Sequence, residues 1–206
     1  MAYSDFKSID DIKQRFNLRI MSGDSLFATT AEVEASTLLQ ETLRENIPLA
    51  LNINTEKARS ELMTAPVLVE VRKMLNRKIS LFSGIEFNVD ESLNLTGYCD
   101  FILSQSPDQV YLEVPVVCIV EAKNENIKSG YPQCMAEMIA ANLFNKKNAT
   151  PVFSILGVVT TGSNWKFLKY QNDTLSIDFD EYLINQTSKL LGIFAEVLSN
   201  PRKEQR

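Results

Sequence analysis

The hydrophobic pattern of the chain centres on a short apolar segment, PVVCIVEAK, at residues 115–123. Side chains two positions apart on a β-strand share a face, so Glu121 and Lys123 are expected to point the same way. Apolar residues precede them on both faces, with Val117 and Ile119 on their own face and Val116, Cys118 and Val120 on the other. Because a strand that is apolar on both faces belongs inside a covered sheet, the pattern predicts a central strand with a polar end.

A second strand is predicted at residues 98–104, which read YCDFILS. Alternation places Tyr98, Asp100 and Ile102 on one face, and Cys99, Phe101 and Leu103 on the other. Asp100 is thus a carboxylate in the middle of an apolar run. A buried carboxylate is costly unless it is paired or bound to a metal, so this position favours a functional site over an ordinary polar strand residue.

The pattern on either side of these two strands alternates between helix and strand. Asn54 is expected to cap a helix that runs to Asn76 and is kinked or divided at Pro66. The other expected elements are a strand at 79–90 with a break near Ser83-Gly84, a helix at 131–145, a strand at 152–160 and a hairpin strand at 165–170. The order helix, three strands, helix, strand predicts an α/β fold with a mixed central sheet flanked by helices.

The length of 206 residues is typical of one domain with a sizeable core. We expect residues 1–53 to form a helical N-terminal extension, with helices at 8–16, capped by Ser8, and at 30–46. A strand is also expected at 18–27, interrupted by a turn at Ser22-Gly23-Asp24. Residues 54–170 are expected to hold the core and the candidate site. Residues 171–206 are expected to supply a C-terminal helix at 180–198 and a charged tail that frays from residue 201.

Asp100, followed by Glu121-Ala122-Lys123 and by a helix that carries Gln133, resembles the PD-(D/E)XK nuclease superfamily, which has the restriction-endonuclease-like fold. The resemblance covers about residues 55–168. A bare D…ExK pattern occurs by chance in many chains, so the resemblance depends on the strand around the Asp, the central strand before the Glu and the helix that follows. The family usually has a Pro or another small residue before the Asp, whereas this chain has Cys99.

The resemblance implies a nuclease that uses Mg²⁺ or Mn²⁺ to hydrolyse the phosphodiester bonds of DNA. In the family the Asp and the Glu bind the metal, so the implied ligands are Asp100, Glu121 and the backbone carbonyl of Ala122. Mg²⁺ prefers oxygen ligands and keeps several waters, so one or two carboxylates suffice to hold it. Lys123 is implied to act on the attacking water and to stabilise negative charge as it develops.

Two further site positions are implied, each with an alternative. An accessory carboxylate from the first helix corresponds best to Glu56, by its distance from Pro66, with Glu61 as the second candidate. The alternative for Glu56 is a solvated helix start that favours an acidic residue. Gln133 is implied to support the site, or it is an ordinary polar residue at a helix start. Glu137, one turn later on the same face, reaches either the site or solvent.

The composition excludes several kinds of site. The chain has no His, which removes His-based zinc sites, Ser-His-Asp triads and imidazole general bases. Its formal net charge of −5 argues against a simple DNA-coating protein, which is expected to be basic. In a nuclease, the acidic residues of the metal site account for part of the negative charge, so the net charge argues less strongly against that function.

The chain is expected to be cytoplasmic. Its apolar runs are too short to span a membrane, and its first residues have neither the basic start nor the apolar core of a signal peptide. Cys99, Cys118 and Cys134 have no metal-ligand spacing, and an odd number of cysteines does not suggest a disulfide framework.

Two functions from different classes remain compatible with these residues. The first is a Mg²⁺-dependent nuclease acting on DNA, for which the resemblance also implies a homodimer. The second is a nuclease-fold binding or partner-recognition module with little or no turnover. The intact Asp100, Glu121 and Lys123 favour the enzyme, whereas the acidic charge and the missing basic stripe favour a protein partner. A small-molecule enzyme of unrelated α/β fold has no Gly-rich phosphate loop to support it.

Overall fold

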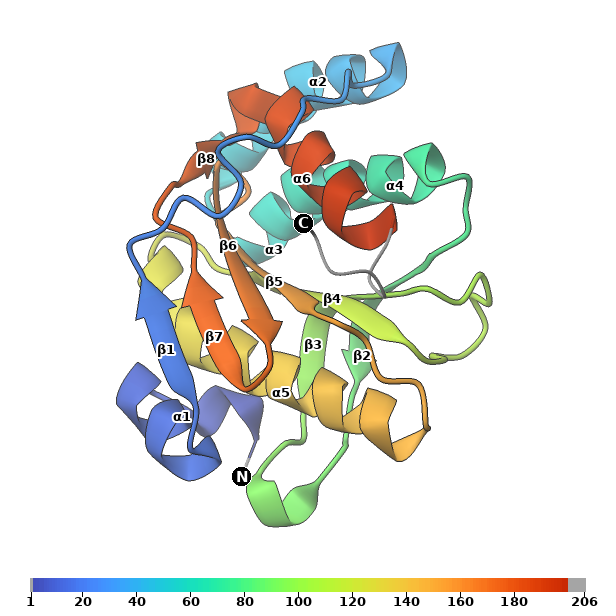
Figure 1. The fold of residues 1–206 in the computed structure, drawn as a ribbon. Helices are drawn as coiled ribbons and strands as arrows, with labels where there is room; N and C mark the ends of the chain where they lie inside the picture. Colours follow the sequence, from blue (N-terminus) through green and yellow to red (C-terminus); the bar gives the residue numbers. More distant parts are fainter. Residues whose placement is uncertain (1, 200–206) are drawn as a thin grey trace.

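A computed structural model of the protein describes residues 2–199, so the predicted frayed tail from residue 201 lies outside the described residues. Within that range eight strands form one mixed sheet, in the order β1-β7-β6-β5-β4-β3-β2 with β8 paired to β6. Helices pack on both of its faces (Figure 1). The predicted α/β class, with a mixed central sheet flanked by helices, is confirmed.

The helices and strands have the following bounds along the chain. They are α1 (Ile9–Phe16), β1 (Arg19–Ser22), α2 (Thr37–Ile53), α3 (Glu56–Arg59), a π-helical turn (Ser60–Thr64), α4 (Ala65–Met74), β2 (Ser80–Glu86), β3 (Tyr98–Ser104), β4 (Val116–Ala122), α5 (Tyr131–Lys147), β5 (Ile155–Thr160), β6 (Asn164–Gln171), β7 (Thr174–Ile177), β8 (Tyr182–Leu183) and α6 (Thr187–Ser199). From α4 to β5 the order is helix, three strands, helix, strand, as predicted. No helix between residues 2 and 199 combines the length and the apolar character needed to cross a membrane.

The sheet separates two buried apolar clusters. Helices α1 and α5 cover one face of the sheet, and α2, α3, α4 and α6 cover the other (Figure 1). The α5 cluster includes Ile119 and Met135, whereas the opposite cluster includes Val120, Leu68 and Phe194. All seven residues of β4 are buried between them, which confirms the predicted central strand.

The alternation along β4 differs from the prediction at Val117. Leu103 of β3 pairs with Cys118, and Ser104 pairs with Val116, which leaves Val117 as the extra residue of a β-bulge. Val117 therefore packs in the same cluster as Cys118, and Val116 packs in the cluster of Ile119, so the predicted faces of Val116 and Val117 are both wrong. Beyond the bulge the alternation resumes, so the polar end of the strand keeps its predicted orientation.

The alternation along β3 breaks at Asp100. Cys99 packs with Ile102 in the α5 cluster, while Phe101 belongs to the opposite cluster, so the predicted shared face of Cys99 and Phe101 is wrong. The position across from Asp100 on β2 is Gly84, between the pairs that Ser83 and Ile85 make. Gly84 has a φ of 62°, a conformation that glycine adopts without the strain of a side chain. The predicted break near Ser83-Gly84 is thus a local twist within one continuous strand.

Both flanking regions take part in the sheet, which corrects the predicted helical extension and C-terminal helix. β1 lies in residues 1–53 and pairs in parallel with β7, and both β7 and β8 lie beyond residue 170. β1 (Arg19–Ser22) lies inside the strand predicted at 18–27 and ends at the predicted turn. β7 and β8 have four and two residues, too short for a period of two to be recognised in the sequence. The C-terminal helix starts at Thr187, after β8, rather than at residue 180.

Two predicted helix starts are also wrong, for reasons of capping. The helix predicted at 30–46 is α2, which begins after Ser36, whose hydroxyl accepts the Leu39 N–H, and it continues past Pro48. Asn54 ends this helix in the left-handed conformation, which Asn tolerates better than most residues. The cap of α3 is instead Thr55. The predicted division before Pro66 appears as the π-helical turn, and Ser8 caps α1 as predicted.

Candidate active site

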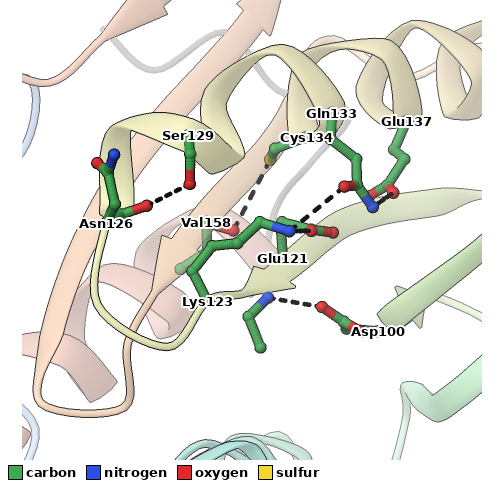
Figure 2. A network of polar contacts seen from close by, with 10 residues as sticks. Asp100, Glu121, Lys123, Asn126, Ser129, Gln133, Cys134, Glu137 and Val158 are labelled. Atoms are coloured by element: carbon green, nitrogen blue, oxygen red, sulfur yellow. Dashed lines mark hydrogen bonds and ion pairs between the residues drawn. The ribbon is translucent and has the colours of Figure 1, made fainter. Parts of the chain in front are cut away.

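The end of β4 holds Lys123 in place. Its backbone N–H donates to the carbonyl oxygen of Thr160 at 2.8 Å, which continues the pairing with β5 beyond the strand. Its Nζ forms an ion pair with Glu121 and lies 3.4 Å from Oε1 of Gln133 on α5 (Figure 2). Glu121 and Lys123 therefore share a face as predicted, and the predicted supporting residue Gln133 contacts the lysine.

Asp100 reaches the same end of the sheet from β3. Its Oδ2 accepts the N–H of Ala122 at 2.7 Å (Figure 2). The carboxylate therefore links β3 to the end of β4, at the position opposite Gly84 of β2. Burial raises the pKa of the Asp100 carboxyl, and the charge of Glu56 adds to this effect, while the Ala122 N–H and Lys123 oppose it. Asp100 is thus a partly buried carboxylate held by the backbone of the E-A-K segment.

Glu121 lies deeper than the sequence alone indicates. The residue is 1% exposed, and its Oε2 has no hydrogen-bond partner within residues 2–199. Burial raises the pKa of its carboxyl, repulsion from Asp100 raises it further, and Lys123 lowers it. An oxygen of this kind is costly to bury unless another group binds it.

Glu137 is a second buried carboxyl that the sequence analysis left open between the site and solvent. It is 0% exposed, and its Oε1 accepts the side-chain N–H of Gln133 at 3.1 Å. Its Oε2 has no partner in the described part of the chain. Burial raises the pKa of the Glu137 carboxyl well above its ordinary value, and Glu121 adds to the shift. In the sequence, only its spacing of four from Gln133 indicated that Glu137 lies near the site. Because α5 is buried over most of its surface, its sequence shows no polar face from which the depth of Glu137 could be predicted.

The charge of Lys123 follows from its neighbours. Burial lowers the pKa of its ammonium group, but the attraction and hydrogen bond of Glu121, together with the charges of Glu56 and Asp100, outweigh burial. The pKa of Lys123 is therefore above its ordinary value, and the side chain is a cation at neutral pH. A permanently charged ammonium orients and stabilises anions but does not accept a proton from water.

A cleft of about 240 Å³ opens beside Asp100, on the α3 side of the strand ends. It is lined by Glu56, Lys57, Ser60, Glu61, Ser83, Gly84, Asp100 and Ala122. Glu61 forms an exposed ion pair with Lys57 at 2.7 Å. Glu56 has no ion pair or hydrogen bond from its carboxylate among residues 2–199, and its charge acts on both Asp100 and Glu121. Of the two candidates for the accessory carboxylate, Glu56 is the one whose charge bears on the site.

The resemblance implies that a carboxylate of the first helix joins Asp100 and Glu121. Within residues 2–199, no three or more His, Cys, Asp or Glu side chains are grouped so that they can hold a metal ion. Glu56, on α3, lines the cleft beside Asp100, whereas the Glu121 side chain points towards α5 (Figure 2). Two carboxylates, Asp100 and Glu121, remain as candidates.

The chemistry of these two carboxylates fits a hard divalent cation. Mg²⁺ takes oxygen ligands and is commonly held by one or two carboxylates together with water. The buried Oε2 of Glu121 lacks any donor in the described chain, and Oδ2 of Asp100 is the only oxygen of that carboxylate with a hydrogen bond there. Ala122, whose carbonyl is the third predicted ligand, lines the cleft beside Asp100.

Comparisons with known proteins assign no family to the chain. A scan against protein-family models and a search of curated proteins both find no match. The residues at the end of β4 are therefore the basis for assigning a function.

Proposed function

We propose that the chain is a metal-dependent nuclease of the PD-(D/E)XK type that hydrolyses the phosphodiester bonds of DNA. The observation that carries the proposal is the position of Lys123 Nζ, held between Glu121 and Gln133 at the end of a central strand. Asp100 lies at the same strand end, bonded to Ala122. The order α4, β2, β3, β4, α5, β5 agrees with a restriction-endonuclease-like core, which we propose as the fold.

The proposed division of labour follows the chemistry of each group. Asp100, Glu121 and the carbonyl of Ala122 would hold Mg²⁺ or Mn²⁺. When bound, such an ion lowers the pKa of a coordinated water and polarises a phosphoryl oxygen. Lys123 orients the attacking water and stabilises the negative charge that develops on the phosphate. Because its pKa is raised, Lys123 acts as a fixed cation rather than as a base.

A cleavage assay with matched variants tests the proposal. Purified protein is incubated with supercoiled plasmid, linear duplex and single-stranded DNA, with Mg²⁺, Mn²⁺ or EDTA. We expect cleavage of at least one substrate that requires the metal and is lost in Glu121→Gln. Cleavage that survives in both Glu121→Gln and Asp100→Asn would point to a contaminating nuclease. A parent protein without any metal-dependent cleavage would contradict the proposal.

A nuclease-fold binding module remains the second candidate, and two observations favour it. The cleft next to Asp100 is acidic, and the charge of its Lys57 is offset by Glu61. Helix α2 also exposes large apolar side chains, among them Leu38 at 66%, Leu49 at 52% and Ile53 at 50%. Surfaces of this kind suit a protein partner better than a polyanion. The same assay separates the candidates, because a binding module leaves every DNA substrate intact.

Gly130 provides a test of how tightly Lys123 must be held. It stands at the N-cap of α5, and an added Cβ would lie 2.6 Å from Cγ1 of Val159 and 3.2 Å from Cγ of Lys123. We expect Gly130→Ala to destabilise the protein by about 1–3 kcal/mol through overpacking and to displace the lysine. Urea unfolding and single-turnover cleavage measure the two effects.

The control for this prediction is Gly157→Ala on β5. Its Cβ would overlap Sδ of Met138, and no atom of Lys123 is among its three nearest contacts. We expect a loss of stability with little loss of cleavage below the unfolding range. Equal loss of cleavage in the two variants, at equal stability, would show that the effect of Gly130→Ala is not specific to Lys123.

A further inference from the structure

The side-chain amide of Gln133 lies between a cation and a carboxyl group. Its Oε1 is 3.4 Å from Nζ of Lys123, and its Nε2 is 3.1 Å from Oε1 of Glu137 (Figure 2). An amide offers an acceptor on one side and two donors on the other. Which side meets the lysine therefore decides whether the contact is a hydrogen bond or a clash of two donors.

We infer that Glu137 is a positioning residue, which fixes the amide orientation of Gln133 and thereby the place of Lys123. A Lys ammonium only donates, so the contact with Gln133 exists only when Oε1 faces Nζ. The Glu137 carboxyl group offers an acceptor to Gln133 in either protonation state: an ionised oxygen, or the carbonyl oxygen Oε1 when Oε2 carries the proton. It therefore draws the NH₂ group of Gln133 towards itself and turns Oε1 towards Lys123. The importance of this position for catalysis rests on the proposed function.

Packing does not explain why a carboxyl side chain occupies position 137. The residue is fully buried, and its Oε2 has no partner within residues 2–199. Burying an unsatisfied polar group costs about 1–3 kcal/mol. Its neighbours on α5 include Ala136 and Met138, both buried and apolar. Stability alone would therefore favour an apolar side chain at position 137, whereas only an acceptor can orient Gln133.

Two variants of similar size separate an orienting role from a packing role. Glu137→Met removes the acceptor and the buried carboxyl together, and Glu137→Gln keeps an oxygen that can accept from Gln133. We expect Glu137→Met to lower kcat about 10- to 100-fold, as is typical of a misplaced catalytic group, with KM unchanged and Tm equal or higher. We expect Glu137→Gln to stay within about threefold of the parent. A neutral Glu137→Met, or equal losses in both variants, would overturn the inference.

A readout without substrate keeps the inference separate from the proposed function. In protein with ¹⁵N-labelled Gln side chains, Gln133→Ala identifies the Gln133 amide signals. These signals should shift in Glu137→Met and stay near the parent positions in Glu137→Gln. Gln40, which donates to Ala35 at 2.8 Å on another part of the molecule, is the unchanged control. Unresponsive Gln133 signals would overturn the inference whatever the activity. Responsive signals in a protein that cleaves no DNA would overturn the nuclease proposal alone.

Discussion

Lys123→Met is expected to lower the single-turnover rate of DNA cleavage by about two to three orders of magnitude, the usual cost of removing one group that stabilises transition-state charge. Lys123 is a cation fixed by Glu121 and Gln133, so its charge requires no reorganisation during the reaction. Methionine keeps the apolar stem that lies near Gly130 and removes only the ammonium group. The measurement is the cleavage rate with saturating enzyme and Mn²⁺.

The control for Lys123→Met is Lys128→Met, a change at an exposed lysine five residues later. We expect Lys128→Met to cleave DNA at a rate within a few-fold of the parent. Both variants replace a lysine by methionine, but only Lys123 lies at the end of β4 beside Glu121. Lys123→Met should also keep a thermal response to Mn²⁺, since the proposed ligands are untouched. An unchanged rate in Lys123→Met would remove the lysine from the mechanism.

Mn²⁺ is expected to raise the melting temperature of the parent protein by about 5–11 °C. A ligand that binds only the folded state stabilises it by about 2.7 kcal/mol at a hundredfold excess over its dissociation constant. Each kcal/mol shifts the melting temperature of a domain of this size by about 2–4 °C. The physical source of the response is the unpartnered Oε2 of Glu121 beside the charge of Asp100. Differential scanning fluorimetry from zero to millimolar Mn²⁺ measures it.

Asp100→Asn and Glu121→Gln should each abolish this thermal response. In Asp100→Asn the new amide would still present an oxygen to the Ala122 N–H, and the charge that repels Glu121 would be gone. We therefore expect no loss of metal-free stability in that variant. Glu61→Gln is the matched control, because Glu61 is exposed and paired with Lys57, and it should keep the full response. A response that survives both site variants would place the metal elsewhere.

The central strand and the spacing of its polar end could be predicted from the sequence because they depend on local periodicity. The uninterrupted apolar run before Glu121 predicted a strand covered on both faces. Because Glu121 and Lys123 are two positions apart, their side chains were predicted to lie on the same face of that strand. The alternation failed where one residue departed from regular geometry. The bulge at Val117 changed the side-chain order on β4, and the order on β3 changed at Asp100, opposite the positive φ of Gly84 on β2. Nothing in the local pattern specifies either event.

The rest of the site was decided by tertiary packing. The sequence offers Glu56 and Glu61 alike as accessory carboxylates, and only the folded helix shows that Glu61 pairs with Lys57. The hydrogen bond from the Ala122 N–H to the Asp100 carboxylate joins β3 to β4. These strands are separated by a loop of 11 residues, so their relative placement depends on the tertiary fold. The depth of Glu137 could not be inferred because the sheet, α1 and the turn at residues 3–5 together bury α5 over most of its surface, so its sequence pattern shows no polar face. Periodicity determines which way a side chain points from its own element, and only the packing of other elements determines what it meets there.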